Sequence, residues 1–143
     1  MKKILSILAI TALVLGTLSC AKPDADYVHD NANLSAIKMG TTQKDATGKE
    51  KALTFDGKID HEAGTVLFTV PKENRKEIDL TAVKLRANVA FDAYVTVTRE
   101  LGKPVDRTLY GIHDISEGID ITITAKMTGR TKNYTLTAKI EKD

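Results

Sequence analysis

The stretch Ile119–Ile140, IDITITAKMTGRTKNYTLTAKI, decides how this chain folds. Apolar residues occupy every second position over 119–127 and again over 134–140, with a turn-forming Thr-Gly-Arg-Thr between the two arms. A period of two is that of a β-strand, because successive side chains point to opposite faces of a sheet. The stretch therefore predicts an antiparallel hairpin with one wet face rich in threonine and one buried face. The buried face should contain Ile121, Ile123, Tyr134 and Leu136.

The same reasoning predicts the other strands. Alternating segments occur at residues 34–39, 55–60, 65–70, 83–87 and 91–98, and residues 105–110 form a short edge strand. A charged connection at 72–79 and a loop at 111–118 separate them, and no helical period appears after residue 20. Short strands divided by turn signals favour an all-β fold, which we expect to be one antiparallel β-sandwich of about seven strands over residues 34–143. Its aromatic core should contain Phe55, Phe68, Phe91 and Tyr134.

The first twenty residues, MKKILSILAITALVLGTLSC, predict export. Two lysines precede a short apolar stretch and small residues, which is the pattern of a secretory signal peptide. The tetrad Thr17–Cys20 resembles a bacterial lipobox, although its leucine stands two positions before the cysteine where three is usual. The resemblance implies that residues 1–19 are removed and that Cys20 is acylated. The membrane should then be a partner through the lipid anchor.

An acidic segment, AKPDADYVHDNAN, follows Cys20. It has no apolar periodicity, so we interpret residues 20–33 as the acylated cysteine and a flexible tether. The acidic run resembles the export signals of Bacteroidetes surface lipoproteins, and Ala21 lacks the aspartate that retains enterobacterial lipoproteins in the inner membrane. This resemblance implies an outer-membrane location on the cell surface.

The charge of the chain argues against binding to nucleic acid. The formal charge of +2 includes Lys2 and Lys3, and 19 basic and 19 acidic side chains remain once these two leave with the signal. A nucleic-acid interface needs a concentrated basic face, which a balanced and mixed composition does not predict.

The closing hairpin and the segment G-K-I-D…G-T-V-L-F-T-V-P around residues 57–71 resemble Ig-like domains of unknown function in Bacteroidetes surface lipoproteins. With the signal, the resemblance covers most of the chain. It implies the fold, and it says little about activity. Such domains often belong to systems for glycan capture, which implies a carbohydrate or a surface protein as the partner.

The sequence offers few candidate catalytic residues. The mature chain has no free cysteine and no Gly-x-Ser-x-Gly elbow, and Ser35 and Ser116 are its only serines after residue 19. We interpret His113, Asp114 and Ser116 as a polar turn, because neighbours in sequence do not make a catalytic triad. The expectation is a protein that is not an enzyme and uses no cofactor.

Two candidate sites remain. Tyr94 lies out of phase with its apolar neighbours and Tyr110 borders the loop at 111–118, so the pair could form an aromatic platform for glycan. Asp114, Glu117 and Asp120 form a weaker candidate for calcium at one end of the sandwich. The leading expectation is a surface binding or accessory module. The alternative is a structural or adhesive component that assembles through sheet edges.

Overall fold

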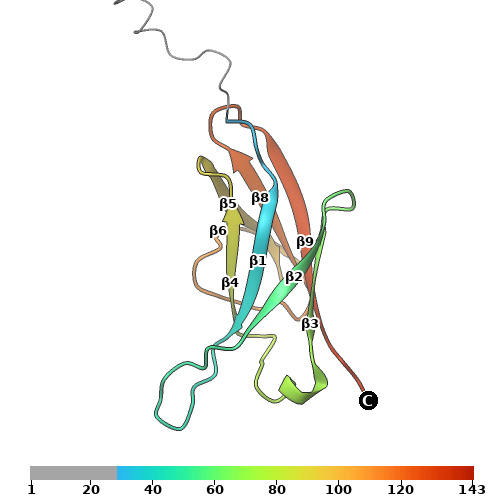
Figure 1. Cartoon of the computed structure of the whole chain (residues 1–143). Coiled ribbons are helices and arrows are strands. Elements are labelled where there is room, and N and C mark those ends of the chain that lie inside the picture. The colour runs from blue at the N-terminus through green and yellow to red at the C-terminus, as the bar shows by residue number, and fades with distance from the viewer. Residues whose placement is uncertain (1–28) are drawn as a thin grey trace, which may run out of the picture.

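The computed structural model describes residues 29–143 (Figure 1). The signal peptide, Cys20 and the tether up to residue 28 lie outside the described residues. The described part is all-β, as predicted, and contains no α-helix. Consistent with this, no helix in residues 29–143 is long and apolar enough to cross a membrane. The elements are β1 (Leu34–Thr41), β2 (Thr54–Asp60), β3 (Thr65–Val70), the 3₁₀ turn η1 (Lys72–Asn74), β4 (Val83–Val89), β5 (Ala93–Glu100), β6 (Lys103–Thr108), β7 (Ile112–His113), β8 (Ile119–Ala125) and β9 (Thr131–Ile140).

Nine strands form one curled, mixed sheet in the order β6-β5-β8-β9-β3-β2-β1-β4-β7. All neighbours are antiparallel except β3 and β9, which pair in parallel from Thr65↔Thr135 to Val70↔Ile140. The expectation of about seven strands, all antiparallel, is therefore wrong on both points. The parallel pair joins segments that lie about half the chain apart, and the alternation within each strand carries no information about such a partner.

The sheet turns a corner within β2. Residues 54–56 of β2 pair with β1, whereas residues 57–60 pair with β3. Gly57 stands at this change of partner, and a Cβ atom there would lie 2.5 Å from Val66 Cγ1. A glycine inside a strand often marks such a close approach of neighbours. The absent side chain is what allows β2 to lie against the packed side chains beneath it.

The closing hairpin is confirmed in pairing and in facing. β8 and β9 pair antiparallel from Ile119↔Leu136 to Thr124↔Thr131. The predicted inward side chains are at most 1% exposed, whereas the threonines between them are half-buried or exposed. Phe55 and Phe68 are buried as predicted. The largest buried side chains come from both halves of the sheet and include Leu34, Ile37, Met39, Phe68, Ile121, Ile123, Tyr134 and Leu136.

Phe91 was expected in the core and is 96% exposed. The amide of Ala93 donates to the carbonyl of Ala90, so residues 90–93 form a turn and β5 begins only at Ala93. The apolar alternation was extended across a turn that the sequence does not mark with glycine or proline. The loops also carry more structure than predicted, since Ile78 is buried and β7 lies within 111–118.

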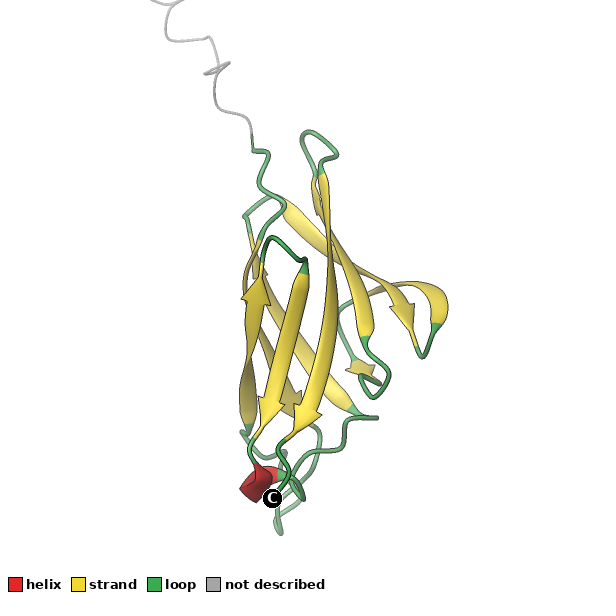
Figure 2. Cartoon of the chain, turned by 90° about the vertical axis from the view of Figure 1, so that its right-hand side faces the viewer, coloured by secondary structure: helices red, strands yellow, loops and turns green. Residues whose placement is uncertain are grey.

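The described part of the predicted tether packs on the domain. Ala32 is buried, and the carboxylate of Asp30 accepts hydrogen bonds from Thr128 and, at 3.0 Å, from Arg130. The bond from Thr128, followed by that from Arg130, holds the pKa of Asp30 below its usual value. The chain is thus fixed to the β8–β9 turn before β1 begins. Figure 1 shows that the described chain enters the domain at the end opposite the C-terminus. Figure 2 shows η1 beside the C-terminus, where Lys72 pairs with Asp143 at 2.6 Å.

Candidate functional site

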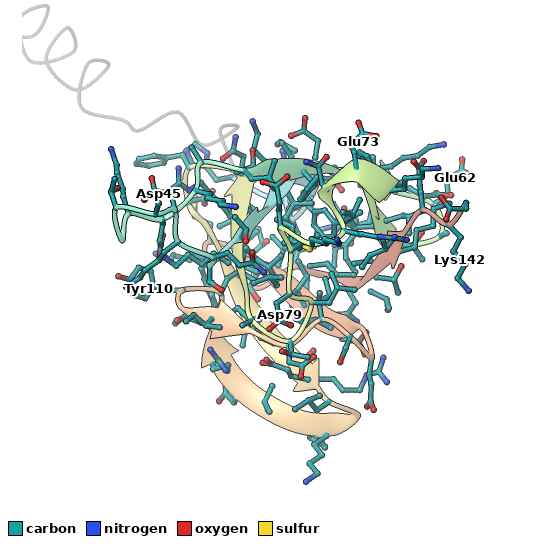
Figure 3. All side chains as sticks on the ribbon, turned by 90° about the horizontal axis from the view of Figure 1, so that it is seen from below. Asp45, Glu62, Glu73, Asp79, Tyr110 and Lys142 are labelled. Carbon is teal, nitrogen blue, oxygen red and sulfur yellow. The ribbon has the colours of Figure 1, made fainter. Side chains whose placement is uncertain are left out.

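An open groove of about 440 Å³ lies between β1, β4, the loop at 42–53 and the segment at 110–111. We call it the Tyr110 groove. Its charged and aromatic lining consists of Lys38, Glu50, Lys51, Lys84, Arg86 and Tyr110. The groove exists because β1 pairs with β4, which brings side chains from distant parts of the sequence to one surface. Figure 3 shows Tyr110 and Asp45, from the loop at 42–53, on the same side of the domain.

The groove is basic, and one of its cations is uncompensated. Lys84 donates to both oxygens of Glu50 at 2.6 and 2.7 Å. Lys51 lies 3.5 Å from Glu77, which is outside the groove. Arg86 is exposed and has no ion pair or hydrogen-bond partner for its side chain among residues 29–143. Its guanidinium is therefore available to a ligand, and its planar fork suits carboxylates and other paired oxygen acceptors.

Tyr110 is displayed by its neighbours in the chain. Leu109 is buried, and its carbonyl oxygen lies 2.9 Å from Nε2 of His113. On the other side, Gly111 has φ +109°, a conformation that residues with a side chain rarely adopt. These two constraints fix the backbone on both sides of Tyr110, whose ring is 92% exposed. The backbone at Tyr110 is thus constrained, while its side chain remains accessible to a ligand.

The second tyrosine of the predicted platform has different neighbours. Tyr94 is 46% exposed on β5, and the Nζ atom of Lys126 lies 5.9 Å from the centre of its ring. Tyr94 does not line the Tyr110 groove, and no contact joins the two rings in the described part of the chain. Both tyrosines are accessible, but only Tyr110 belongs to a hollow in the surface.

A buried polar cluster that the sequence did not indicate binds the backbone next to Tyr110 through the carbonyl of Leu109. Oε2 of Glu100 lies 3.1 Å from Nδ1 of His113, and Oε1 accepts from the amide of Asp114 at 2.7 Å. Arg107 reaches the same carboxylate at 3.4 Å and donates to the carbonyl of Ile112 at 3.0 Å. Both ring nitrogens of His113 face oxygen acceptors, so both bonds form when both nitrogens donate. The cluster joins β5, β6 and β7, where the two ends of the curled sheet meet.

This cluster is not a catalytic triad. His113 is 1% exposed and bonds to Glu100, whereas Ser116 bonds to Asp114 through its amide at 2.9 Å and through its hydroxyl. The polar turn expected at these residues is thus present, with His113 turned into the core.

The three carboxylates proposed for calcium do not come together. Asp120 accepts from Nε of Arg99 at 2.6 Å and from the hydroxyl of Thr135 at 2.8 Å. The bond from Arg99, the largest cause, holds the pKa of Asp120 below its usual value. Asp114 is engaged by Ser116. Within residues 29–143 no group of three or more histidine, cysteine, aspartate or glutamate side chains is placed to hold a metal ion.

A second hollow, of about 370 Å³, lies over the outward side of β8 and β9 near the β2–β3 turn. Its polar groups already bond to one another: Thr122 donates to Asn133 at 2.7 Å, and Asp120 is occupied as described above. It offers a ligand fewer unused groups than the Tyr110 groove.

Comparison with known proteins adds little to this description. No family model and no curated protein matches the sequence. Among solved structures, the fold is similar to that of a protein from Bacteroides fragilis described as a candidate secreted protein. The two are 22% identical, the match covers 81% of this chain and 100% of the other, and the TM-score is 0.47. A likeness this distant carries no argument about function, which has to come from the geometry of the site.

Proposed function

We propose that this protein is a lipid-anchored binding module of the outer cell surface, which holds a carbohydrate in the Tyr110 groove and performs no catalysis. The observation that carries the proposal is the ring of Tyr110, 92% exposed at a groove of about 440 Å³. Small-molecule sites typically occupy about 300–1,000 Å³ and combine an apolar contact surface with a few polar groups.

The chemistry of the groove suits a sugar. The apolar face of a pyranose ring can stack on the face of an aromatic side chain, and tyrosine adds a hydroxyl group at its edge. Arg86, Lys38 and the Glu50–Lys84 pair provide donors and acceptors for sugar hydroxyls. The unpaired guanidinium of Arg86 favours a saccharide that carries a carboxylate.

The location is supported by the signal sequence, the Cys20 lipobox and the acidic segment after it. The resemblance of the closing hairpin to Ig-like domains of surface lipoproteins supports the same assignment. Cys20→Ser should abolish labelling by a fatty-acid analogue, and proteinase added to intact cells should remove the domain. Unchanged labelling of Cys20→Ser would refute the lipid anchor, and full protection until lysis would place the domain on the periplasmic side.

Ligand binding is tested by calorimetry with a panel of neutral and uronic-acid oligosaccharides. Tyr110→Ala should weaken binding roughly tenfold, about 1.4 kcal/mol, which is the size expected of one aromatic contact. Tyr94→Ala is the matched control, since it removes an exposed tyrosine outside the groove and should leave the affinity unchanged. Equal losses in both variants would favour the two-tyrosine platform instead. A panel without any binder, or an unaffected Tyr110→Ala, would refute the carbohydrate site.

Assembly through sheet edges is less well supported. At one edge, β6 carries Lys103, Pro104 and Asp106, and at the other β7 is only two residues long. Charged side chains, proline and short edge strands are the means by which proteins prevent edge-to-edge pairing. We therefore prefer the groove to the edges as the functional surface.

A further inference from the structure

Three segments meet at the end of the domain where the described chain begins. They are residues 29–32, residues 90–94, which comprise the β4–β5 turn and the start of β5, and the β8–β9 turn at 126–130, and we call this end the apex. The amide of Lys126 donates to the carbonyl of Asp92 at 3.1 Å, which ties the two turns together. The rings of His29 and Phe91 lie 6.4 Å apart, and Asp30 is bound by Arg130. Figure 1 shows these segments gathered at the upper end.

The apex exposes large apolar side chains. Phe91 is 96% exposed and Met127 is 60% exposed, one on each of the two joined turns. Turn positions are usually occupied by small or polar residues, so the stability of the turns does not explain a phenylalanine and a methionine here. Isolated apolar residues on a surface are ordinary, but these two lie on turns that a hydrogen bond joins, and we call the pair the apolar tip.

Amphipathic groups surround this tip. Tyr94 is 46% exposed, and the ammonium group of Lys126 lies 5.9 Å from the centre of its ring. Tyrosine is enriched where a membrane meets water, and lysine can bury its stem while its charge stays in the water. An apolar tip with tyrosine and lysine behind it has the composition of a surface that enters the headgroup region of a bilayer.

The position of the lipid anchor relative to the apex indicates which surface it meets. Cys20 precedes His29 by nine residues, which span about 30 Å at full extension. The chain is then fixed to the apex through Asp30 and Ala32. An anchor at Cys20 therefore keeps this end of the domain near the bilayer. The C-terminus and the loop at 42–53, which flanks the Tyr110 groove, lie at the other end (Figure 1).

We propose that the apex docks on the bilayer that holds the acyl chains of Cys20, with Phe91 and Met127 entering the boundary between headgroups and acyl chains. The proposal rests on the lipid anchor proposed above. Docking orients the domain, so that the Tyr110 groove faces away from the membrane. An amphipathic surface of this kind adds to an acyl anchor without spanning the bilayer.

The experiment uses the absence of tryptophan from the chain. Phe91→Trp places the only indole of the chain at the apex, and Tyr110→Trp, at a position 92% exposed, is the matched control at the groove. Each full-length lipidated variant is reconstituted into phosphatidylcholine vesicles with or without brominated acyl chains. Flotation of the vesicles measures anchoring, and quenching of the indole by bromine measures contact with the bilayer. Because both positions are exposed, neither substitution should disturb the fold, which circular dichroism verifies.

Docking predicts that brominated lipid quenches the Phe91→Trp reporter several-fold more than the Tyr110→Trp reporter, with emission of the former shifted to shorter wavelength. A protein that floats while its Phe91→Trp reporter stays unquenched would overturn docking and leave the anchor intact. That result would assign the apolar tip to a protein partner. Equal quenching at both positions would overturn the orientation, and a protein that does not float would overturn anchor and docking together. Saccharide binding is measured separately, so its failure is distinguishable from each of these outcomes.

Discussion

Gly57→Ala tests whether the corner in β2 is as tightly packed as the structure shows. The new methyl group would lie 2.5 Å from Val66 Cγ1, 2.8 Å from Ile37 Cγ2 and 3.0 Å from Phe68 Cε1. These three side chains are at most 2% exposed, so they cannot move into solvent. Overpacking of this kind destabilises the folded state by about 1–3 kcal/mol. Alanine also lowers the conformational entropy of the unfolded chain, which stabilises the folded state by about 0.4–1 kcal/mol. The free energy of unfolding should fall by about 1–2 kcal/mol.

Gly40→Ala is the matched control, because it also lies inside a strand and its Cβ would meet nothing closer than 3.7 Å. It should be neutral or should stabilise by up to about 1 kcal/mol. Urea unfolding of the soluble chain from Ala21 onward measures both variants, and the loss at Gly57 should lower the midpoint by about 1 M. Val66→Ala removes the nearest clashing atom, so Gly57→Ala should cost less in that background. If Gly57→Ala were as harmless as Gly40→Ala, the assigned corner would be wrong.

Three further predictions use the same soluble chain. Ile123→Ala should cost about 2–5 kcal/mol because its side chain is fully buried, whereas Thr124→Ala on the opposite face should cost at most about 1 kcal/mol. Equal costs in urea unfolding, or a larger cost at Thr124, would mean that the assigned facing is wrong. Neither carboxylate oxygen of Asp92 has a hydrogen-bond partner within residues 29–143, so Asp92→Asn should raise the free energy of unfolding by about 1–3 kcal/mol. A loss of that size would reveal a partner outside residues 29–143. The pKa of Asp120 is lowered by Arg99, so its stabilising effect is complete above the unfolded value of about 4 and disappears as the pH falls through the lower folded value. With Asp120→Asn, the free energy of unfolding should therefore fall less steeply as the pH drops below about 4. An unchanged pH dependence in this range would argue against the ion pair between Asp120 and Arg99.

The sequence predicted what depends on side-chain periodicity. The pairing of the closing hairpin and the inward facing of Ile121, Ile123, Tyr134 and Leu136 were correct, because alternation is a local property of a strand. The first arm was predicted to run to Met127, but β8 ends at Ala125 and Met127 is 60% exposed in the turn. The parallel partner of β3 could not be predicted, since pairing between distant strands leaves no trace in either one. The Tyr110 groove was missed for the same reason, as its cations meet only after β1 pairs with β4. Of the groove, only Tyr110 was foreseen, from its position beside a loop.

The burial of the Glu100 carboxylate is a second feature that could not be predicted from the sequence. The register shifts between Val97 and Arg99, so an irregularity interrupts the alternation of β5. After the shift Glu100 is buried in place of Arg99, and it meets His113 there. A bulge of one residue reverses the facing of every later side chain in the strand, and no glycine between Val97 and Arg99 indicates a bulge in this sequence. Phe91 was misplaced in a similar way, by a turn at 90–93 that contains Asp92 but no glycine or proline.

The parallel pairing of β3 with β9 also governs when the domain can fold. Thr65 and Thr135 lie about half the chain apart, so their pairing must overcome the entropy of closing a long loop. Such non-local contacts slow folding, and sheets dominated by them typically fold in about milliseconds to seconds. The hairpins on either side of this pair can form earlier, but the core between them stays open until β9 arrives. A chain that emerges with its amino end first therefore cannot complete this core before β9 has emerged.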